Sequence, residues 1–226
     1  MNIARSWPIP AAVAAVVAAA LGLLAAVYAT DAADGGSKGN GASLERTERS
    51  VAFREDMRAL WEDHIVWTRA FIVSFAADSE DQDEVAARLL ANQEHIGDAI
   101  TPFYGEAAGN QLTELLSEHI LGAVTLLKAA KSGDSSEFEA ARAAWYANGE
   151  EIAQFLNGAN PEHWPLDHTS HHMTMHLDLT LREAANRLSG NFSADIADYD
   201  AVHNAILEMA DFLSLGIIRQ FPKEFR

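Results

Sequence analysis

The sequence predicts an all-α fold: a six-helix bundle built from three αα-hairpin repeats and preceded by an N-terminal signal or anchor helix. From about residue 45 onward, apolar residues recur at three- and four-residue steps, which is the period of a helix face and not of a strand. Gly or Pro residues separate several of these stretches. A histidine also recurs at intervals of 55 and 57 residues, at His64, His119 and His176, which indicates a repeated unit.

The N-terminal segment, residues 1–29, is apolar enough to enter a membrane. Residues 9–28 form an Ala/Val/Leu run preceded by a single positive charge, Arg5, and about 20 such residues suffice to span a bilayer. Val27-Tyr28-Ala29 resembles a cleavage site with small residues. A cleaved signal peptide and a retained membrane anchor both fit, and both place the rest of the chain on the extracytoplasmic side. The membrane is therefore one expected partner.

Residues 30–44 are expected to form a flexible linker, because they include the Gly-rich string from Gly35 to Gly41. Residues 45–226 then form the helical bundle domain. A folded part of about 180 residues is large enough for one hydrophobic core, so a single domain is expected.

The first three expected helices cover residues 45–77, 80–101 and 107–131. Pro102 and Gly105 close the second, and Gly133 closes the third. Residues on their apolar faces are, in order, Phe53, Met57, Trp61, His64 and Phe71; then Val85, Leu89, Asn92 and Ile96; then Leu112, Leu116, His119 and Leu126.

The last three expected helices cover residues 136–157, 167–188 and 194–219. Ser135 and Ser136 are the expected cap of the first of these, and a connection broken by Pro161 and Pro165 separates it from the next. Residues on the apolar faces of the first and last are Phe138, Trp145, Asn148 and Ile152; then Val202, His203, Ile206, Leu213 and Ile217.

Charge and cysteine content exclude several functions. The formal net charge of −17 falls in residues 51–226, because the acidic and basic residues before them balance. An acidic field of this size repels nucleic acid and anionic lipid, so no nucleic-acid partner is expected. There is no cysteine, which excludes disulfides, thiolate metal sites and cysteine nucleophiles.

The recurring histidines indicate a transition-metal site in the core. His64, His119 and His176 open successive hairpins, and facing helices of a bundle can bring such side chains to one point. Neutral imidazoles are common ligands of Zn, Cu and Fe, so any of these metals fits. Acidic neighbours such as Glu62 and Glu118 could complete the shell or orient the rings.

Two further histidines are candidate ligands of the same ion. Asn92, Asn148 and His203 occupy matching places on the return helices, 56 and 55 residues apart, so His203 is the expected fourth nitrogen. His172 lies four residues before His176 and so shares its helix face. A second, more exposed candidate favours copper and comprises His163, His168, His171, His172, Met173 and Met175.

Two readings without a metal stay open. The histidines and asparagines could form a buried polar network that fixes helix register in an interaction or sensor module. The bundle could also bind a small molecule. Such a bundle could take a second copy of itself or another helical protein as a partner. No nucleophile elbow, phosphate-binding glycine loop or His-Glu-x-x-His motif is present, so no catalytic residues are predicted.

Several short strings resemble a family of bacterial secreted or membrane-anchored all-helical proteins whose activity is uncharacterised. The strings are Leu60-Trp61-Glu62-Asp63-His64 with Trp67-Thr68-Arg69, Pro102-Phe103-Tyr104-Gly105, Trp145-Tyr146-Ala147-Asn148, His176-Leu177-Asp178-Leu179-Thr180 and Gln220-Phe221-Pro222. The resemblance covers roughly residues 55–222 and implies the helical fold. Some relatives carry the label glycosyltransferase, but this sequence lacks the glycine loop, strand–helix alternation and DxD motif that would support it.

Overall fold

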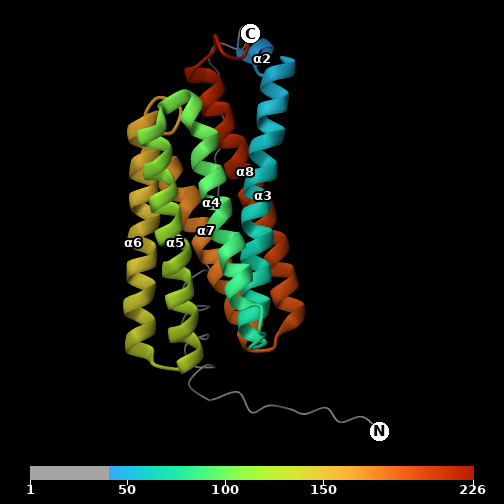
Figure 1. Ribbon diagram of the computed structural model, residues 1–226, viewed down its shortest axis with the longest axis vertical. Helices are drawn as coiled ribbons and strands as arrows, with labels where there is room; N and C mark the ends of the chain where they lie inside the picture. Colours follow the sequence, from blue (N-terminus) through green and yellow to red (C-terminus); the bar gives the residue numbers. More distant parts are fainter. Residues whose placement is uncertain (1–40) are drawn as a thin grey trace.

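The computed structural model describes residues 41–226, and within them it confirms the all-α prediction: six long helices and no strand (Figure 1). The predicted signal or anchor at residues 1–29 and most of the predicted linker lie outside the described residues. The elements are α2 (Gly41–Leu44), α3 (Glu48–Ala76), α4 (Gln82–Tyr104), α5 (Glu106–Ser132), α6 (Ser135–Ala159), α7 (Leu166–Leu188) and α8 (Phe192–Gln220). The short helix α2 occupies the end of the stretch expected to be a linker.

The six long helices form a closed ring of antiparallel neighbours (Figure 1). Each helix packs against the next one in the chain, and α3 packs against α8 to close the ring. Helix α7 also contacts α3 and α5 across the interior. Three of the helices, α3, α5 and α7, therefore run in the same direction, and each opens one hairpin.

Two helix boundaries differ from the prediction. Helix α4 continues through Pro102 to Tyr104 and ends at Gly105, whose φ of 85° suits glycine. Proline is tolerated there because the hydrogen bond that it removes would go to the carbonyl of Asp98, an exposed residue. Helix α6 is capped by Asp134 and not by the serines, since the Asp134 carboxylate accepts from the backbone N–H groups of Ser136 and Glu137.

Helices α4 and α5 approach each other most closely at two glycines. A Cβ atom added at Gly97 would lie 2.6 Å from the carbonyl oxygen of Gly109, and one added at Gly109 would lie 2.8 Å from the carbonyl oxygen of Gly97. Both distances are far below van der Waals contact. The spacing of the two helices therefore depends on the absence of side chains at these positions.

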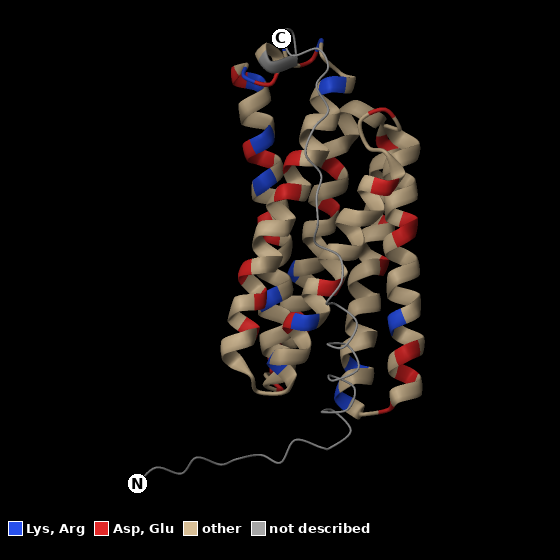
Figure 2. Ribbon diagram, turned by 180° about the vertical axis from the view of Figure 1, so that it is seen from behind, with Lys and Arg blue, Asp and Glu red and all other residues tan. Residues whose placement is uncertain are grey.

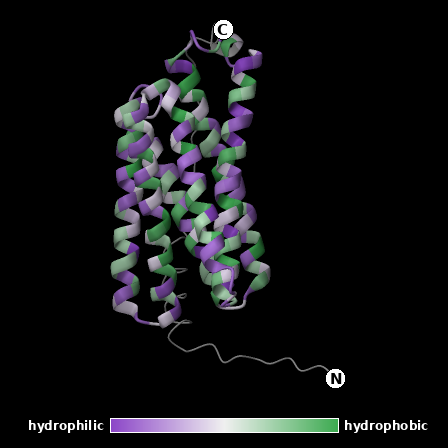
Figure 3. Cartoon of the chain, in the orientation of Figure 1, coloured by the Kyte–Doolittle hydropathy of each residue, from purple (hydrophilic) through white to green (hydrophobic). Residues whose placement is uncertain are grey.

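The interior is organised in layers along the bundle axis, and the helices carry both apolar and polar residues along their length (Figure 3), the buried apolar ones forming the core. At the end that carries the C-terminus, Phe53, Phe103 and Phe225 pack with ring centroids 5.2–5.6 Å apart, and we call this group the aromatic cap. Below it come an apolar chamber, then the predicted histidines, and then a layer of paired charges. The candidate site thus lies in the middle of the molecule.

The charged layer is held between α3, α7 and α8. It consists of Arg69, Arg182, Glu183, Arg187, Asp195 and Asp198. Arg69 donates to Glu183 Oε1 at 2.8 Å and to both carboxylate oxygens of Asp195. Arg182 donates to Asp198 at 2.6 Å. Because the three carboxylates are buried, the three arginines are needed to compensate their charge. Most other acidic residues are exposed, and they occur along the length of the bundle (Figure 2).

Replacing Glu183 with glutamine is expected to stabilise the protein more at pH 8 than at pH 5. Burial raises the pKa of Glu183 to about 7, although Arg69 beside it acts in the opposite direction. From about pH 4.5 upward the unfolded chain releases this proton while the folded protein keeps it, so the contribution of Glu183 to stability is lost as the pH rises towards 7. Glutamine keeps an oxygen for Arg69 and removes that loss, which is about 1–3 kcal/mol.

Urea unfolding at the two pH values measures this difference. The exposed residue Glu118 provides the control, because Glu118→Gln is expected to change stability equally at both. Equal effects of Glu183→Gln at pH 5 and pH 8 would contradict the prediction.

Helix α8 is long and apolar enough to cross a membrane, judged by length and composition alone, and no other helix among residues 41–226 is. In this structure it belongs to the bundle. Its residues Ile206, Met209, Leu213 and Ile217 are buried against the other helices.

Candidate metal centre

His64 lies on the inner face of α3 with 2% of its surface exposed. Its Nδ1 atom lies 3.3 Å from Nε2 of Gln93 on α4. The ring of Trp61, one turn earlier on α3, meets the imidazole edge-on with centroids 5.8 Å apart. Because the amide nitrogen of Gln93 can only donate, Nδ1 of His64 accepts and the ring proton is on Nε2.

His119 lies on α5 in an equivalent setting, 3% exposed. Its Nδ1 atom lies 2.9 Å from the side-chain oxygen of Asn148 on α6, so Nδ1 carries the proton that it donates. Trp145 stacks on the imidazole with centroids 5.1 Å apart, and its indole N–H donates to the His119 carbonyl at 3.1 Å. The lone pair of His119 is therefore on Nε2.

The first two hairpins repeat one hydrogen bond. Asn92 donates to the carbonyl of Leu60 at 3.0 Å, and Asn148 donates to the carbonyl of Leu115 at 3.1 Å. Each acceptor lies four residues before the histidine of its hairpin. In the third hairpin, His203 does not repeat this contact.

His176 on α7 joins the two other histidines. It is 4% exposed, and its ring centroid lies 5.8 Å from that of His64 and 6.2 Å from that of His119. Its Nδ1 atom is fully buried and has no hydrogen-bond partner. Buried ring nitrogens normally have a partner, and among the described histidines Nδ1 of His172 shares this lack. We call the three residues the histidine cluster.

All three rings of the histidine cluster are neutral at physiological pH. Burial lowers the pKa of His64 to about 3 and that of His119 to about 4, and it holds the pKa of His176 well below its ordinary value. Proximity adds to this, since a charge on His119 would disfavour one on His64, and a charge on either would disfavour one on His176. Neutral imidazoles keep the lone pairs that bind metals.

His203 and His172 contact other residues than the histidine cluster. His203 is one-third exposed and pairs with Glu62 of α3 at 3.2 Å, so Glu62 is turned outward too. His172 packs against Phe212 of α8 with centroids 4.8 Å apart. Both histidines lie where their helices face a neighbour in the ring rather than the axis. Glu118, the other acid considered for the shell, is exposed.

Only part of the exposed His/Met group comes together: the ring centroids of His171 and His172 lie 6.1 Å apart, and burial and then the nearby His171 and His168 lower the pKa of His172. His168 is 64% exposed in its side chain and His171 is also exposed, whereas Met173 is buried in the core.

As the side chains stand, no three His, Asp or Glu residues within residues 41–226 have the spacing of a metal-ligand set. The spacing of the rings in the histidine cluster comes close to that of a metal-ligand set. Three imidazole nitrogens at about 2.0–2.1 Å from one tetrahedral ion would place the ring centroids about 5 Å apart. The centroid distances in the histidine cluster, 5.8 and 6.2 Å, exceed this by about 1 Å.

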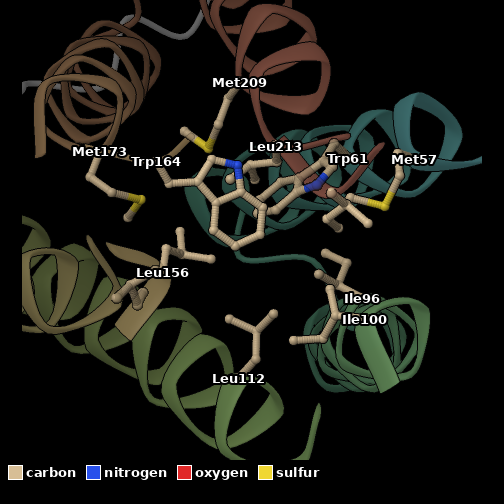
Figure 4. A pocket seen from close by; sticks show the side chains of 12 residues that line it. Met57, Trp61, Ile96, Ile100, Leu112, Leu156, Trp164, Met173, Met209 and Leu213 are labelled. Atoms are coloured by element: carbon tan, nitrogen blue, oxygen red, sulfur yellow. The ribbon is translucent and has the colours of Figure 1, made fainter. Parts of the chain in front are cut away.

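An apolar chamber of about 20 Å³ lies one helical turn from the histidine cluster, on the side of the aromatic cap (Figure 4). Its lining includes Met57, Trp61, Ile96, Ile152, Met173 and Met209. Side chains on a helix lean towards its N-terminus, and α3, α5 and α7 all begin at the cap end. The three imidazoles therefore lean towards the chamber.

Sequence reasoning missed Gln93, the chamber and the charged layer. Two signals were available in the sequence: Gln93 directly follows Asn92, and Glu183, which belongs to the charged layer, lies two turns after His176 on an otherwise apolar face. No family model, curated protein or solved structure matches the chain, so the family resemblance stays a prediction.

Proposed function

We propose that the protein binds one transition-metal ion in its interior through His64, His119 and His176. The observation that carries this proposal is the convergence of three buried, neutral imidazoles from three helices, one of which has a buried nitrogen without a partner. Each such nitrogen is destabilising by about 1–3 kcal/mol unless something binds it. Bringing His176 to metal-sharing distance of His64 and of His119 requires each of these two pairs of rings to approach by about 1 Å.

The amides of the first two hairpins support this assignment. A metal-bound imidazole needs its other nitrogen protonated and held by an acceptor. Asn148 already accepts from Nδ1 of His119, and Asn148 is itself fixed by the carbonyl of Leu115. Beside His64 the amide of Gln93 presents its nitrogen to Nδ1, at 3.3 Å, and its side-chain oxygen has no hydrogen-bond partner, so this amide must turn over before it can accept from a ring N–H.

We further propose that the protein acts on the extracytoplasmic side of a membrane, attached through residues 9–28. This rests on the apolar run in the sequence, which is long enough to span a bilayer. Expression with a C-terminal reporter that is active only outside the cytoplasm tests the location independently of metal binding.

The rival function is a helical interaction module in which the same residues form a polar network without a metal. It is favoured by the hydrogen bonds from Gln93 to His64 and from His119 to Asn148, which hold without any ion. The two functions differ in what happens when a histidine is removed.

Titration of the full chain, purified without a histidine tag, with Co(II) tests the metal site. One equivalent is expected to bind and to raise the free energy of unfolding at pH 7.5, by about 2.7 kcal/mol at a concentration 100 times the Kd. Near pH 5 this stabilisation is expected to vanish, because protons compete for the same lone pairs.

Two variants separate the functions. His119→Ala is expected to abolish binding, whereas His203→Ala, which removes a histidine outside the histidine cluster, is expected to retain it. If the wild-type protein binds no metal and the His119→Ala variant has a much lower free energy of unfolding, the network function replaces the metal site.

A further inference from the structure

We propose that the ion is monovalent and soft, namely Cu(I), and that the thioether of Met173 is its fourth donor. This inference rests on the proposed metal site and names the ion that this site selects. Three features carry it: the lack of negative charge around the histidine cluster, the depth of the site, and the sulfur atoms of the chamber beside it.

No carboxylate compensates an ion at the histidine cluster. The influences that shift the three histidine pKa values are burial, the other imidazoles and two amides. Glu183, the buried acid on α7, lies two turns beyond His176 and is bound by Arg69. Of the acids within two residues of the cluster histidines, Glu62 and Glu118 are exposed, Asp63 pairs with Arg88, and Asp178 accepts from the Tyr146 hydroxyl. No negatively charged side chain therefore compensates the charge of an ion bound at the histidine cluster.

The depth of the site makes that charge decisive. All three imidazoles are more than nine-tenths buried, and the chamber beside them has an apolar lining. In the Born description the cost of moving an ion out of water rises with the square of its charge, so a divalent ion costs about four times as much as a monovalent ion of the same size. Neutral donors and an apolar interior therefore favour a singly charged metal ion.

The chamber supplies the ligand type that a monovalent copper ion prefers. Thioether sulfur is a soft donor that selects Cu(I), and imidazole also suits copper. Met57, Met173 and Met209 all present their side chains to the chamber (Figure 4).

Of these three, Met173 is placed best. It lies one turn before His176 on α7, and a Cβ atom added at Gly149 would lie 3.8 Å from its terminal methyl group. Gly149 follows Asn148, the partner of His119. The end of the Met173 side chain thus reaches the level of the histidine cluster, and its flexible thioether can turn towards an ion there.

The test compares Cu(I) with Co(II) on the full, untagged chain under argon, with a competing chromophoric chelator in each titration. We expect one equivalent of Cu(I), bound more tightly than Co(II), with sulfur in its X-ray absorption fine structure. Met173→Leu is expected to weaken Cu(I) binding at least about tenfold, since losing even an outer-shell partner of a metal site costs 10–100-fold in affinity. The same variant is expected to leave Co(II) binding unchanged.

Met209→Leu is the matched control. It removes the chamber methionine of α8, the helix next to α7, and is expected to bind Cu(I) as tightly as the wild type. Co(II) binding that equals or exceeds Cu(I) binding would overturn the Cu(I) assignment and leave the proposed function intact. Equal effects of Met173→Leu and Met209→Leu would remove Met173 from the ligand set. If the protein binds neither Cu(I) nor Co(II), both the inference and the proposed function are overturned.

Discussion

The free energy of unfolding of the metal-free protein is expected to fall by several kcal/mol as the pH drops from about 6.5 to about 4. Above this range the three cluster histidines are neutral in both the folded and the unfolded state. Below pH 6.5 the unfolded chain takes up protons on them, whereas folded His64 and His119 do not until about pH 3 and 4. The unfolded state therefore gains stability, by about 1.4 kcal/mol per pH unit for each histidine.

Glu183 partly offsets this effect, because between about pH 4.5 and 7 the folded protein holds a proton there that the unfolded chain has released. His172, whose pKa burial also lowers, adds to the effect of the cluster histidines, so the net slope between pH 6.5 and 4.5 should correspond to about two to three protons taken up on unfolding. Urea unfolding in the presence of a chelator, at half-unit pH steps, measures the slope.

His176→Leu isolates the contribution of one buried histidine. His176 Nδ1 has no hydrogen-bond partner, so an apolar side chain of similar size leaves no polar group unpaired. In this variant the number of protons taken up on unfolding should be smaller by about one. The variant should also be at least as stable as the wild type at pH 5. His203→Gln, at the one-third exposed histidine, is the control and should keep the wild-type slope. Stability independent of pH between 6.5 and 4.5 would show that the cluster histidines are not held neutral.

Replacing Gly97 with alanine is expected to destabilise the protein by about 3 kcal/mol or more, at the upper end of the cost of overpacking. The new methyl group would meet the backbone oxygen of Gly109 at 2.6 Å and also the Thr113 side chain. Backbone cannot rotate away as a side chain can, so α4 and α5 must separate. That separation would also disturb Gln93, one turn earlier on α4, and with it His64.

Gly158→Ala provides the control for that substitution. Gly158 also lies in a helix, but a Cβ atom there would have no neighbour within 4 Å. Alanine has the higher helix propensity, so this variant should be unchanged or more stable by up to about 1 kcal/mol. Urea unfolding gives the free energy of unfolding of each variant, and values within about 0.5 kcal/mol of each other would rule out a tight α4–α5 contact.

The helices were predictable because their signal is local. Apolar residues at three- and four-residue steps set each helix, and Gly105 and Gly133 mark two of the ends. The errors were local too. Pro102 was taken as a stop, yet it occupies the last turn, where the lost hydrogen bond belongs to a residue at the surface. Asp134 caps α6, because its carboxylate reaches two N–H groups of the first turn.

The histidine cluster was predictable only as far as the repeat is regular. His64, His119 and His176 lie on helices that run the same way, so equal spacing in sequence becomes equal height in the bundle. His203 lies in the most divergent hairpin, where α8 must face both α7 and α3, and it turns towards Glu62. The chamber and the charged layer arise from helices distant in sequence, such as α3 and α8, and only Glu183 on the apolar face of α7 indicates one of them locally.

The contact between α3 and α8 sets the order in which the molecule can be completed during synthesis. Neighbours such as α3 and α4 can pair as soon as they are made, whereas Arg54 and Asp211, which join α3 to α8, are 157 residues apart. One flank of α3 must therefore stay unpaired until the last helix has left the ribosome. The helices that carry the three cluster histidines exist before then. Met209 and Leu213 of α8 arrive last, so the histidines can assemble before the wall of the chamber beside them is in place.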